Sequence, residues 1–527
     1  MKVDSDLQAI QEVRNLCRAG NSAQEIYANF TQDEVDKVAV AVAEAGFRHS
    51  EELAKMAVRE TGYGNVADKI KKNQFAARNV FESIRDLRTV GIINEDRKKK
   101  ILEIAYPMGV VVAIIPTTNP TSTTIFKTLI SLKTGNAILI SPHPRASKCI
   151  RQTANILIDA AIRAGAPEGL IGVITKATLQ STQELMRCSD TAVILATGGS
   201  GLVRAAYSAG KPAYGVGPGN VPVYVSRCAN IKKAASDIVS GKTFDNSTLC
   251  SSEQAIIVDE PIVSRMKEAL INEGCYFMQA EESKALAKTI LAPTGYVTPE
   301  MVGKSAQFLA EKAGIQIPDK ARVLVTELQG VGKMYPFSAE KLCPTLAFYR
   351  VNGPEEGIRR SVEILQYGGM GHTAAIHCKD DELIRRFSLA APASRIIVNS
   401  PSSMGAVGYT NSLVPSFTLG CGSYGRNITA DNLTASHLMN IKRVAYETKP
   451  LAAARNNNGW KPNVKHDWRN VDAPYSKALS SDLSRKSKSQ PQPADETAMP
   501  SKEVRYGSSG MTEAEVDRVI TTFLAQK

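Results

Sequence analysis

The segment 243–254, TFDNSTLCSSEQ, places Cys250 in a polar loop of small residues, between a helix-like stretch and the apolar run AIIV. A cysteine that only fills space usually lies among aliphatic side chains. A thiol in such a loop is open to a substrate, and nearby backbone N–H groups can stabilise both a thiolate and the oxyanion formed by attack on a carbonyl. Cys250 is therefore a candidate nucleophile.

The other eight of the nine cysteines compete for this role. Cys17 and Cys149 fall in helix-like segments, and Cys228 and Cys275 show no partner pattern. Cys421, in LGCGSYG, is a looser second candidate. The six histidines have no metal-ligand spacing and no Cys-x-x-Cys pair is present, so we expect no metal site.

The elements around these residues follow an alternating pattern. Residues 5–90 have helical periodicity, and from residue 101 apolar strand-like runs alternate with helix-like stretches up to about residue 400. Such alternation is typical of βαβ units and a parallel sheet. The sequence thus predicts an α/β protein, and its 527 residues are too many for a single hydrophobic core.

Composition narrows the class of protein. The chain is 43% hydrophobic and 22% charged, which is ordinary for a soluble globular protein, and no window is apolar enough to span a membrane. The N-terminus lacks an apolar signal region, so we expect reduced thiols in a cytosolic compartment. The net charge of +12 is spread among acidic residues without interleaved aromatics, so we expect no nucleic-acid partner.

The C-terminal part differs from the rest. Residues 450–510 are polar and rich in Pro and Ser, which predicts a disordered linker. Residues 511–527 then show a capping-box pattern at Thr512 and Glu515 and one apolar helical face. A short amphipathic helix on a tether is suited to docking on a partner, although it could also fold back on its own chain.

Six further motifs accompany the Cys250 loop. They are YPMGVVVAIIPTTNPTST (106–123), GNAILISPHPRA (135–146), ATGGSGLV (196–203), GVGPGNVPVYV (215–225), KLCPTLAFYRV (341–351) and GGMGHTAAIH (368–377). Over roughly residues 5–445 these seven motifs occur in the order found in the aldehyde dehydrogenase superfamily. They resemble its CoA-acylating branch, which includes acetaldehyde and propionaldehyde dehydrogenases.

The resemblance implies catalytic roles for three residues. Cys250 would attack an aldehyde carbonyl, and the Asn119 amide with the Cys250 backbone N–H would bind the developing oxyanion. His372 matches a histidine of the acylating branch that could deprotonate the CoA thiol, since histidine ordinarily titrates near neutral pH. Val216 stands where hydrolytic relatives have a water-activating glutamate, so coenzyme A rather than water would accept the acyl group.

The family binds its dinucleotide in a Rossmann-like fold without the usual glycine fingerprint. TGGSG (197–201) would open a helix whose N-terminus suits a pyrophosphate. Glu340 resembles the glutamate that holds the nicotinamide ribose. NAD is favoured, and NADP stays open because Arg145 would not repel a 2′-phosphate. The predicted cofactor-binding residues are Thr117, Pro142, His143, Thr197, Gly198, Gly199, Ser200, Gly217 and Glu340.

We therefore predict an aldehyde dehydrogenase fold with a Rossmann-like cofactor domain, an α/β catalytic domain and a small oligomerisation element. The expected ranges are 1–227 for the cofactor domain, with an oligomerisation hairpin near 88–106, 228–400 for the catalytic domain, 401–449 for a return segment with an oligomerisation strand, 450–510 for the linker and 511–527 for the helix.

The predicted reaction converts a short aldehyde, propionaldehyde or acetaldehyde, NAD⁺ and coenzyme A into acyl-CoA and NADH. The C-terminal extension resembles encapsulation peptides of bacterial microcompartment enzymes. It implies a bacterial cytoplasmic homo-oligomer, dimer or tetramer, packaged with shell or cargo proteins. The alternatives are an enzyme for a functionalised aldehyde, such as sulfoacetaldehyde or succinic semialdehyde, and a non-catalytic scaffold.

Overall fold

The computed structural model of the chain describes residues 4–293 and 295–449. These residues fall into a large unit, which holds 4–95 and 102–443 apart from 294, and a small unit of 96–101 and 444–449. The predicted linker (450–510) and terminal helix (511–527) lie outside the described residues. Within the described part of the chain, every helix is too short or too polar to cross a membrane.

The first sheet of the large unit has five parallel strands in the order β5-β4-β3-β6-β7. Every residue of β3 and β4 is buried, which explains why these strands appear in the sequence as unbroken apolar runs rather than as alternating patterns. The strands are β3 (Val110–Ile115), β4 (Ala137–Pro142), β5 (Ile171–Val173), β6 (Thr191–Thr197) and β7 (Ala213–Val216).

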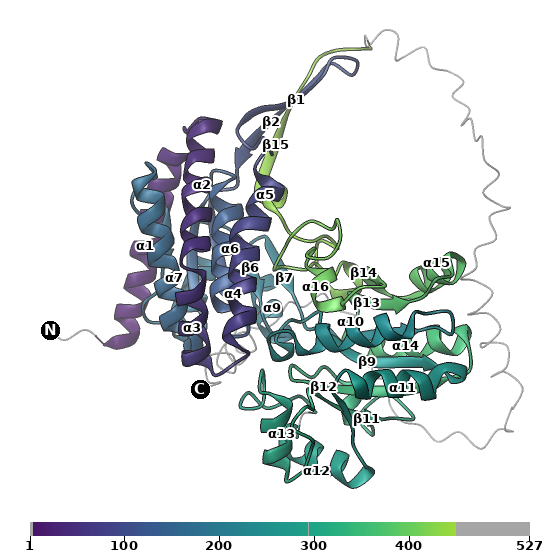
Figure 1. The fold of residues 1–527 in the computed structure, drawn as a ribbon. Coiled ribbons are helices and arrows are strands. Elements are labelled where there is room, and N and C mark those ends of the chain that lie inside the picture. Colours follow the sequence, from purple (N-terminus) through teal and green to yellow (C-terminus); the bar gives the residue numbers. More distant parts are fainter. Residues whose placement is uncertain (1–3, 294, 450–527) are drawn as a thin grey trace, which may run out of the picture. The chain divides into compact units, whose positions relative to one another are not determined.

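Helices cover this sheet as the N-terminal periodicity predicted (Figure 1). They are α1 (Ser5–Tyr27), α2 (Gln32–Arg48), α3 (Ser50–Thr61), α4 (Val66–Gln74), the π-helical turn η1 (Phe75–Asn79), α5 (Val80–Ile84), α6 (Pro120–Leu132), α7 (Ser147–Arg163), α8 (Leu179–Arg187) and α9 (Ser200–Tyr207). Local signals set their ends: Thr31 and Glu34 form a capping box at α2, and Pro120 occupies the first turn of α6.

The second sheet has seven parallel strands in the order β10-β11-β12-β9-β8-β13-β14. The strands are β8 (Val221–Val225), β9 (Glu253–Asp259), β10 (Cys275–Phe277), β11 (Val323–Glu327), β12 (Thr345–Val351), β13 (Gly371–His377) and β14 (Ala393–Val398). Its helices are α10 (Ile231–Thr243), α11 (Val263–Asn272), α12 (Ala280–Ile290), α13 (Ala306–Ala313), α14 (Pro354–Gly368), α15 (Asp381–Ala390) and α16 (Ser402–Ala406).

The chain passes from the first sheet to the second earlier than the sequence suggested. The first sheet ends with β7 at Val216, and β8 already pairs with β9 and β13 of the second sheet. The crossing therefore lies at residues 217–220, within VGPGN, rather than at residue 227. Within the motif GVGPGNVPVYV, the glycines and the first proline separate β7 from β8.

A third sheet has three strands in the order β1-β2-β15, formed by β1 (Gly91–Asp96), β2 (Ile101–Pro107) and β15 (Met439–Ala445). These strands occupy the segments for which we predicted a hairpin near 88–106 and a C-terminal strand. The role of this sheet in oligomerisation stays a prediction.

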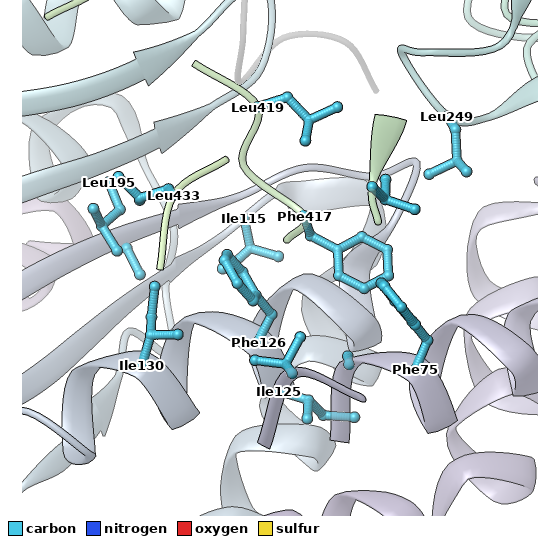
Figure 2. Packing of buried hydrophobic residues seen from close by; sticks show 14 of the residues in the cluster. Phe75, Ile115, Ile125, Phe126, Ile130, Leu195, Leu249, Phe417, Leu419 and Leu433 are labelled. Carbon is cyan, nitrogen blue, oxygen red and sulfur yellow. The ribbon is translucent and has the colours of Figure 1, made fainter. Parts of the chain in front are cut away.

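Apolar packing joins the segment around residue 417 to the first sheet and its helices. Phe417 contacts the rings of Phe75 and Phe126 edge-on, with centroids 5.7 and 6.2 Å apart. Figure 2 shows these rings together with Leu249, which lies next to Cys250. The loop that carries the candidate nucleophile is thus packed on the core to which η1 and α6 also contribute.

Candidate active site

The Cys250 loop has an uncommon backbone conformation. Between α10 and β9, the three consecutive residues Asp245, Asn246 and Ser247 all have positive φ angles of 47°, 51° and 67°. Side chains other than glycine disfavour this left-handed region, so surrounding contacts must hold it. The strain lies immediately before Thr248, Leu249 and Cys250, and it directs the chain so that the cysteine faces a pocket.

Asp245 is the centre of those contacts. Its buried carboxylate accepts hydrogen bonds from Lys69 Nζ at 2.9 Å, from the Asn65 N–H at 2.9 Å and from Thr248 Oγ1 at 2.5 Å. Lys72 Nζ is a further partner of the same carboxylate. Although burial raises the pKa of Asp245, the two ammonium groups outweigh this and hold it below its usual range. Asp245 is therefore an anion inside the protein, paired with two cations.

Asn119 is oriented by this cluster. Its Oδ1 accepts a hydrogen bond from Lys72 Nζ at 2.5 Å, and its Nδ2 donates to Thr118 Oγ1 at 3.1 Å and lies 3.4 Å from the Thr248 carbonyl oxygen. A lysine ammonium has only donors, so it selects the amide orientation with the oxygen toward Lys72 and the NH₂ toward the Cys250 loop. This is the orientation that an oxyanion-binding amide requires.

His372 contacts the candidate nucleophile directly. Its Nε2 lies 3.2 Å from Cys250 Sγ, and its Nδ1 lies 2.9 Å from Thr373 Oγ1. Burial, together with Arg395, lowers the pKa of His372 to about 3. The sequence analysis expected a histidine that titrates near neutral pH; complete burial removes that property, so the imidazole is neutral at working pH.

The thiol of Cys250 is also protonated in this state. Burial and then the charge of Glu340 raise the pKa of Cys250 to about 12. A thiol beside a neutral imidazole donates its hydrogen to the unprotonated nitrogen, so Nε2 is the acceptor and Nδ1 carries the proton. The pair is a hydrogen-bonded thiol and imidazole rather than a thiolate–imidazolium ion pair.

A pocket next to Cys250 gathers most of the residues predicted from sequence. It is lined by Cys250, Asn119, Thr117, His143, Thr197, Gly198, Gly199, Gly217 and Glu340, together with Val216, Leu249, Phe417 and others. His372 reaches the site through Cys250 rather than by lining the pocket. Pro142 ends β4 and does not line this pocket, and Ser200 is the first residue of α9.

The pocket has features that suit a dinucleotide. Gly199 is the N-cap of α9, where free backbone N–H groups favour a phosphate, and a Cβ placed on Gly199 or Gly217 would meet no atom within 4 Å. Glu340 accepts a hydrogen bond from the Gly219 N–H at 3.1 Å, and burial raises its pKa to about 7. The available donors and space therefore fit a nicotinamide dinucleotide.

A second pocket shares Leu249, Val407 and Phe417 with the first. Its walls are mixed: apolar and aromatic side chains line one part, and four charged groups, Asp68, Lys71, Lys72 and Arg322, line the rest. All four already have polar partners: Asp68 pairs with Lys71, Lys72 pairs with Asp245, and Arg322 Nη2 donates to Thr243 Oγ1 at 2.9 Å. The remaining wall residues are Phe75, Ser240, Thr243, Phe244, Met404 and Tyr409.

Several functional residues were missed by sequence reasoning. Lys69 and Lys72 lie in the helical run ADKIKKNQ, where lysines usually cover a solvated face, yet both are almost fully buried. Arg395 lies in the strand SRIIV and donates to the His372 carbonyl oxygen at 2.8 Å. The repeat of lysine at i and i+3 in a polar helical segment is also what a solvated helix face shows, so the sequence offered no signal that these two lysines are buried.

Comparison with known proteins identifies the family of this chain. The aldehyde dehydrogenase family model matches residues 6–276. The bifunctional aldehyde-alcohol dehydrogenase of Escherichia coli K12 is 42% identical over 441 residues, which cover 83% of this chain and 49% of that protein. The chain thus spans about half the length of this curated relative.

Two solved structures resemble this one. An acetylating aldehyde dehydrogenase from Geobacillus thermoglucosidasius is 51% identical with a TM-score of 0.84, covering 85% of this chain and 99% of that one. A propionaldehyde dehydrogenase from the fucose utilisation microcompartment of Clostridium phytofermentans is 30% identical with a TM-score of 0.76, covering 82% and 97%.

Proposed function

The chain belongs to the aldehyde dehydrogenase family, and from that premise we propose that it is a CoA-acylating aldehyde dehydrogenase. It oxidises a short aliphatic aldehyde to acyl-CoA through a thioester on Cys250. The observation that carries this proposal is the joint placement of Cys250, Asn119 and His372, with Val216 where hydrolytic relatives have a glutamate.

The first step is attack of Cys250 Sγ on the aldehyde carbon. A carbon–sulfur bond forms, the carbonyl π bond breaks, and negative charge develops on the oxygen. Asn119 Nδ2 and the Cys250 N–H are the proposed donors to that oxygen, and Lys72 adds a fixed positive charge behind the amide. The resting thiol and imidazole are both neutral, so the thiol proton leaves as the carbon–sulfur bond forms, with Nε2 of His372 the first acceptor.

The residues that would hold the dinucleotide are Gly198 and Gly199 at the start of α9, Thr197, Gly217 and Glu340. The nicotinamide, when bound there, supplies the hydride acceptor for the oxidation. Gly217 and Gly199 leave space next to the backbone, and the Glu340 carboxylate is a hydrogen-bond acceptor suited to ribose hydroxyls. His143, whose pKa is lowered to about 4 by burial and by Arg145, adds no cationic charge at neutral pH.

Coenzyme A is the proposed acyl acceptor because Val216 replaces the water-activating carboxylate. Val216 is nearly completely buried and lines the pocket with an apolar side chain. The nearest rival is hydrolysis. Glu340 also lines the pocket, and a carboxyl group with a pKa of about 7 is suited to activating water. Its hydrogen bond from Gly219 and its resemblance to the ribose-binding glutamate favour a cofactor role instead.

The substrate class follows from the second pocket. Phe75, Phe244, Leu249, Val407 and Phe417 provide an apolar wall. An unsubstituted alkyl chain gains free energy from burial against these residues. Lys71, Lys72 and Arg322 on the same walls would suit a carboxylate or sulfonate instead. Propionaldehyde or acetaldehyde is the proposed substrate, and succinic semialdehyde or sulfoacetaldehyde is the alternative that the assay must separate from it.

The test is formation of reduced nicotinamide from propionaldehyde, measured by absorbance with and without coenzyme A and with NAD⁺ or NADP⁺. Turnover should need coenzyme A and vanish in Cys250→Ala, while Cys188→Ala, a half-buried cysteine that lines neither pocket, should keep it. Equal turnover without coenzyme A would make water the acceptor, and loss of that turnover in Glu340→Gln would then identify its base. Faster turnover of sulfoacetaldehyde or succinic semialdehyde would refute the substrate class.

We also propose that the C-terminal segment 511–527 directs the enzyme to a microcompartment as a homo-oligomer. Support comes from its amphipathic sequence pattern and from the microcompartment origin of one similar structure. A chain ending at residue 449 should keep full turnover but lose co-assembly with shell proteins. If truncation instead abolishes turnover, the segment is part of the catalytic unit. If turnover is absent in the full chain as well, the scaffold alternative stands.

A further inference from the structure

Cys228 and Cys378 lie 150 residues apart in the sequence, yet their sulfur atoms are 3.2 Å apart. Cys228 follows β8 and Cys378 follows β13, two strands that are paired in parallel. The pairing of Val225 with His377 and the hydrogen bond from the Ser226 N–H to the His377 carbonyl oxygen at 3.1 Å bring the two loops together. The contact is therefore set by the sheet rather than by flexible side chains.

The backbone around Cys378 is fixed independently. Asn399, which follows β14, accepts from the Cys378 N–H at 3.0 Å and donates to the Cys378 carbonyl oxygen at 2.7 Å. Two side-chain bonds therefore hold this one residue in place. The sulfur of Cys378 is completely buried, whereas Cys228 is half-buried and can be reached from solvent.

The two sulfurs have different surroundings. Cys228 Sγ lies 3.0 Å from Ser226 Oγ and accepts a hydrogen bond from the Lys379 N–H at 3.4 Å. Burial raises the pKa of Cys228, but these donors and the neighbouring thiol outweigh it and leave the pKa below its usual range. Burial raises the pKa of Cys378. Cys228 is thus the better nucleophile, and Cys378 is placed to react second.

We propose that Cys228 and Cys378 form a redox-modification site that a hydroperoxide oxidises to an intramolecular disulfide. The Cys228 thiolate attacks a peroxide oxygen, so a sulfur–oxygen bond forms, the O–O bond breaks and the leaving hydroxide takes a proton to become water. Cys378 sulfur then attacks the resulting sulfenic acid. The sulfur–sulfur bond forms, the sulfur–oxygen bond breaks, and the second hydroxide leaves as water with the Cys378 proton.

This chemistry is separate from catalysis. Neither cysteine lines either pocket, and Cys250, which does, is a protonated thiol with a raised pKa. A second close pair offers an internal comparison. Cys17 also forms a hydrogen bond with Cys188, but burial and the acidic neighbours Glu184 and Asp190 raise the pKa of Cys17. We expect that pair to react more slowly.

The experiment treats the full chain with hydrogen peroxide, blocks remaining thiols, digests without reduction and maps the peptides by mass spectrometry. We expect the peptides carrying Cys228 and Cys378 to be linked with loss of two hydrogen atoms. Two of the nine thiols should disappear first and return with a thiol reductant. Cys228→Ser should abolish the link with turnover unchanged, and Cys378→Ser should leave Cys228 as a sulfenic acid trapped by a 1,3-dione.

Two results would overturn the proposal. One is oxidation of Cys228 in the wild-type chain while Cys378 stays alkylatable. The other is earlier loss of thiols at Cys17, Cys188 or Cys250 while the Cys228–Cys378 peptides remain unlinked. Both results are measured on the wild-type chain, so the outcome does not depend on whether a variant folds.

Discussion

Replacing Lys72 with methionine tests how the site orients its oxyanion donor. Lys72 Nζ donates to Asn119 Oδ1 at 2.5 Å and to Thr248 Oγ1 at 3.1 Å, and pairs with Asp245. Methionine has a similar volume and no donor, so the amide of Asn119 loses the partner that selects its orientation. Without it, the amide oxygen can turn toward the developing oxyanion, where it repels the charge.

The expected changes in kcat and in stability follow from these contacts. Removal of a whole oxyanion donor typically lowers kcat by about a hundred- to a thousand-fold. Lys72→Met leaves Asn119 present but misoriented part of the time, so we expect kcat to fall by about ten- to a hundred-fold with KM changed far less. Asp245 keeps Lys69, Thr248 and the Asn65 N–H as partners. The free energy of unfolding should therefore fall by about 3 kcal/mol, the smallest loss typical of a buried ion pair that loses one partner.

The assay is a double-mutant cycle on steady-state turnover with Lys72→Met, Asn119→Ala and the double variant, with thermal unfolding measured on each. If Lys72 acts through Asn119, its replacement should have little further effect once Asn119 is absent. Lys55→Met is the matched control, because Lys55 is 61% exposed, pairs with Glu51 and lines neither pocket. Fully additive effects on kcat, or unchanged kcat with a lowered Tm, would refute the positioning role.

Three further predictions concern the same site. Because the pKa of Cys250 is raised to about 12, its rate of alkylation by iodoacetamide should rise about tenfold per pH unit from pH 7 to 9. An alkylation rate that levels off near neutral pH would contradict the assignment of a neutral thiol beside a neutral imidazole. Glu340 has a pKa raised to about 7, so its protonated form favours folding below the unfolded value of 4.5, and that contribution is lost as pH rises through 7. Glu340→Gln should therefore be more stable than wild type at pH 8 by about 3 kcal/mol, with little difference at pH 4. It should also raise KM for the dinucleotide, and equal Tm differences at both pH values would refute the shift. Phe417→Ala removes a ring that lines both pockets and packs on Phe75 and Phe126. It should lower the free energy of unfolding by about 3–5 kcal/mol and shift kcat/KM toward longer aldehydes. An unchanged chain-length preference would show that the second pocket does not hold the alkyl chain.

The predicted assembly of the site from distant motifs agrees with the structure for most residues. Asn119, Thr197, Gly217, Cys250 and Glu340 come from different segments and line one pocket. They could be found from sequence because each belongs to a local motif with turn residues at the end of a strand or the start of a helix. The seven ordered motifs then related those segments to a known family.

Local pattern by itself predicted the α/β class and the strands and helices on either side of Cys250. It made Cys250 only a candidate nucleophile, and the resemblance to the family then implied that role. These depend on residue periodicity and turn chemistry, which act over a few residues. The sequence placed the boundary between the cofactor and catalytic domains at residue 227, whereas the chain crosses between the two sheets at 217–220. The difference arises because short apolar runs can be divided into strands in more than one way.

Only the tertiary structure decided which groups are charged and which are in contact. Lys72 looks like a surface lysine until its burial against Asp245 and Asn119 is known. His372 is a neutral hydrogen-bond acceptor rather than a group that titrates near pH 7, because the fold buries it beside Arg395. Cys228 and Cys378 meet only because β8 and β13 are adjacent strands. A shifted pKa and a contact between distant side chains depend on desolvation and on distances between segments far apart in the chain, and both arise only when the chain folds.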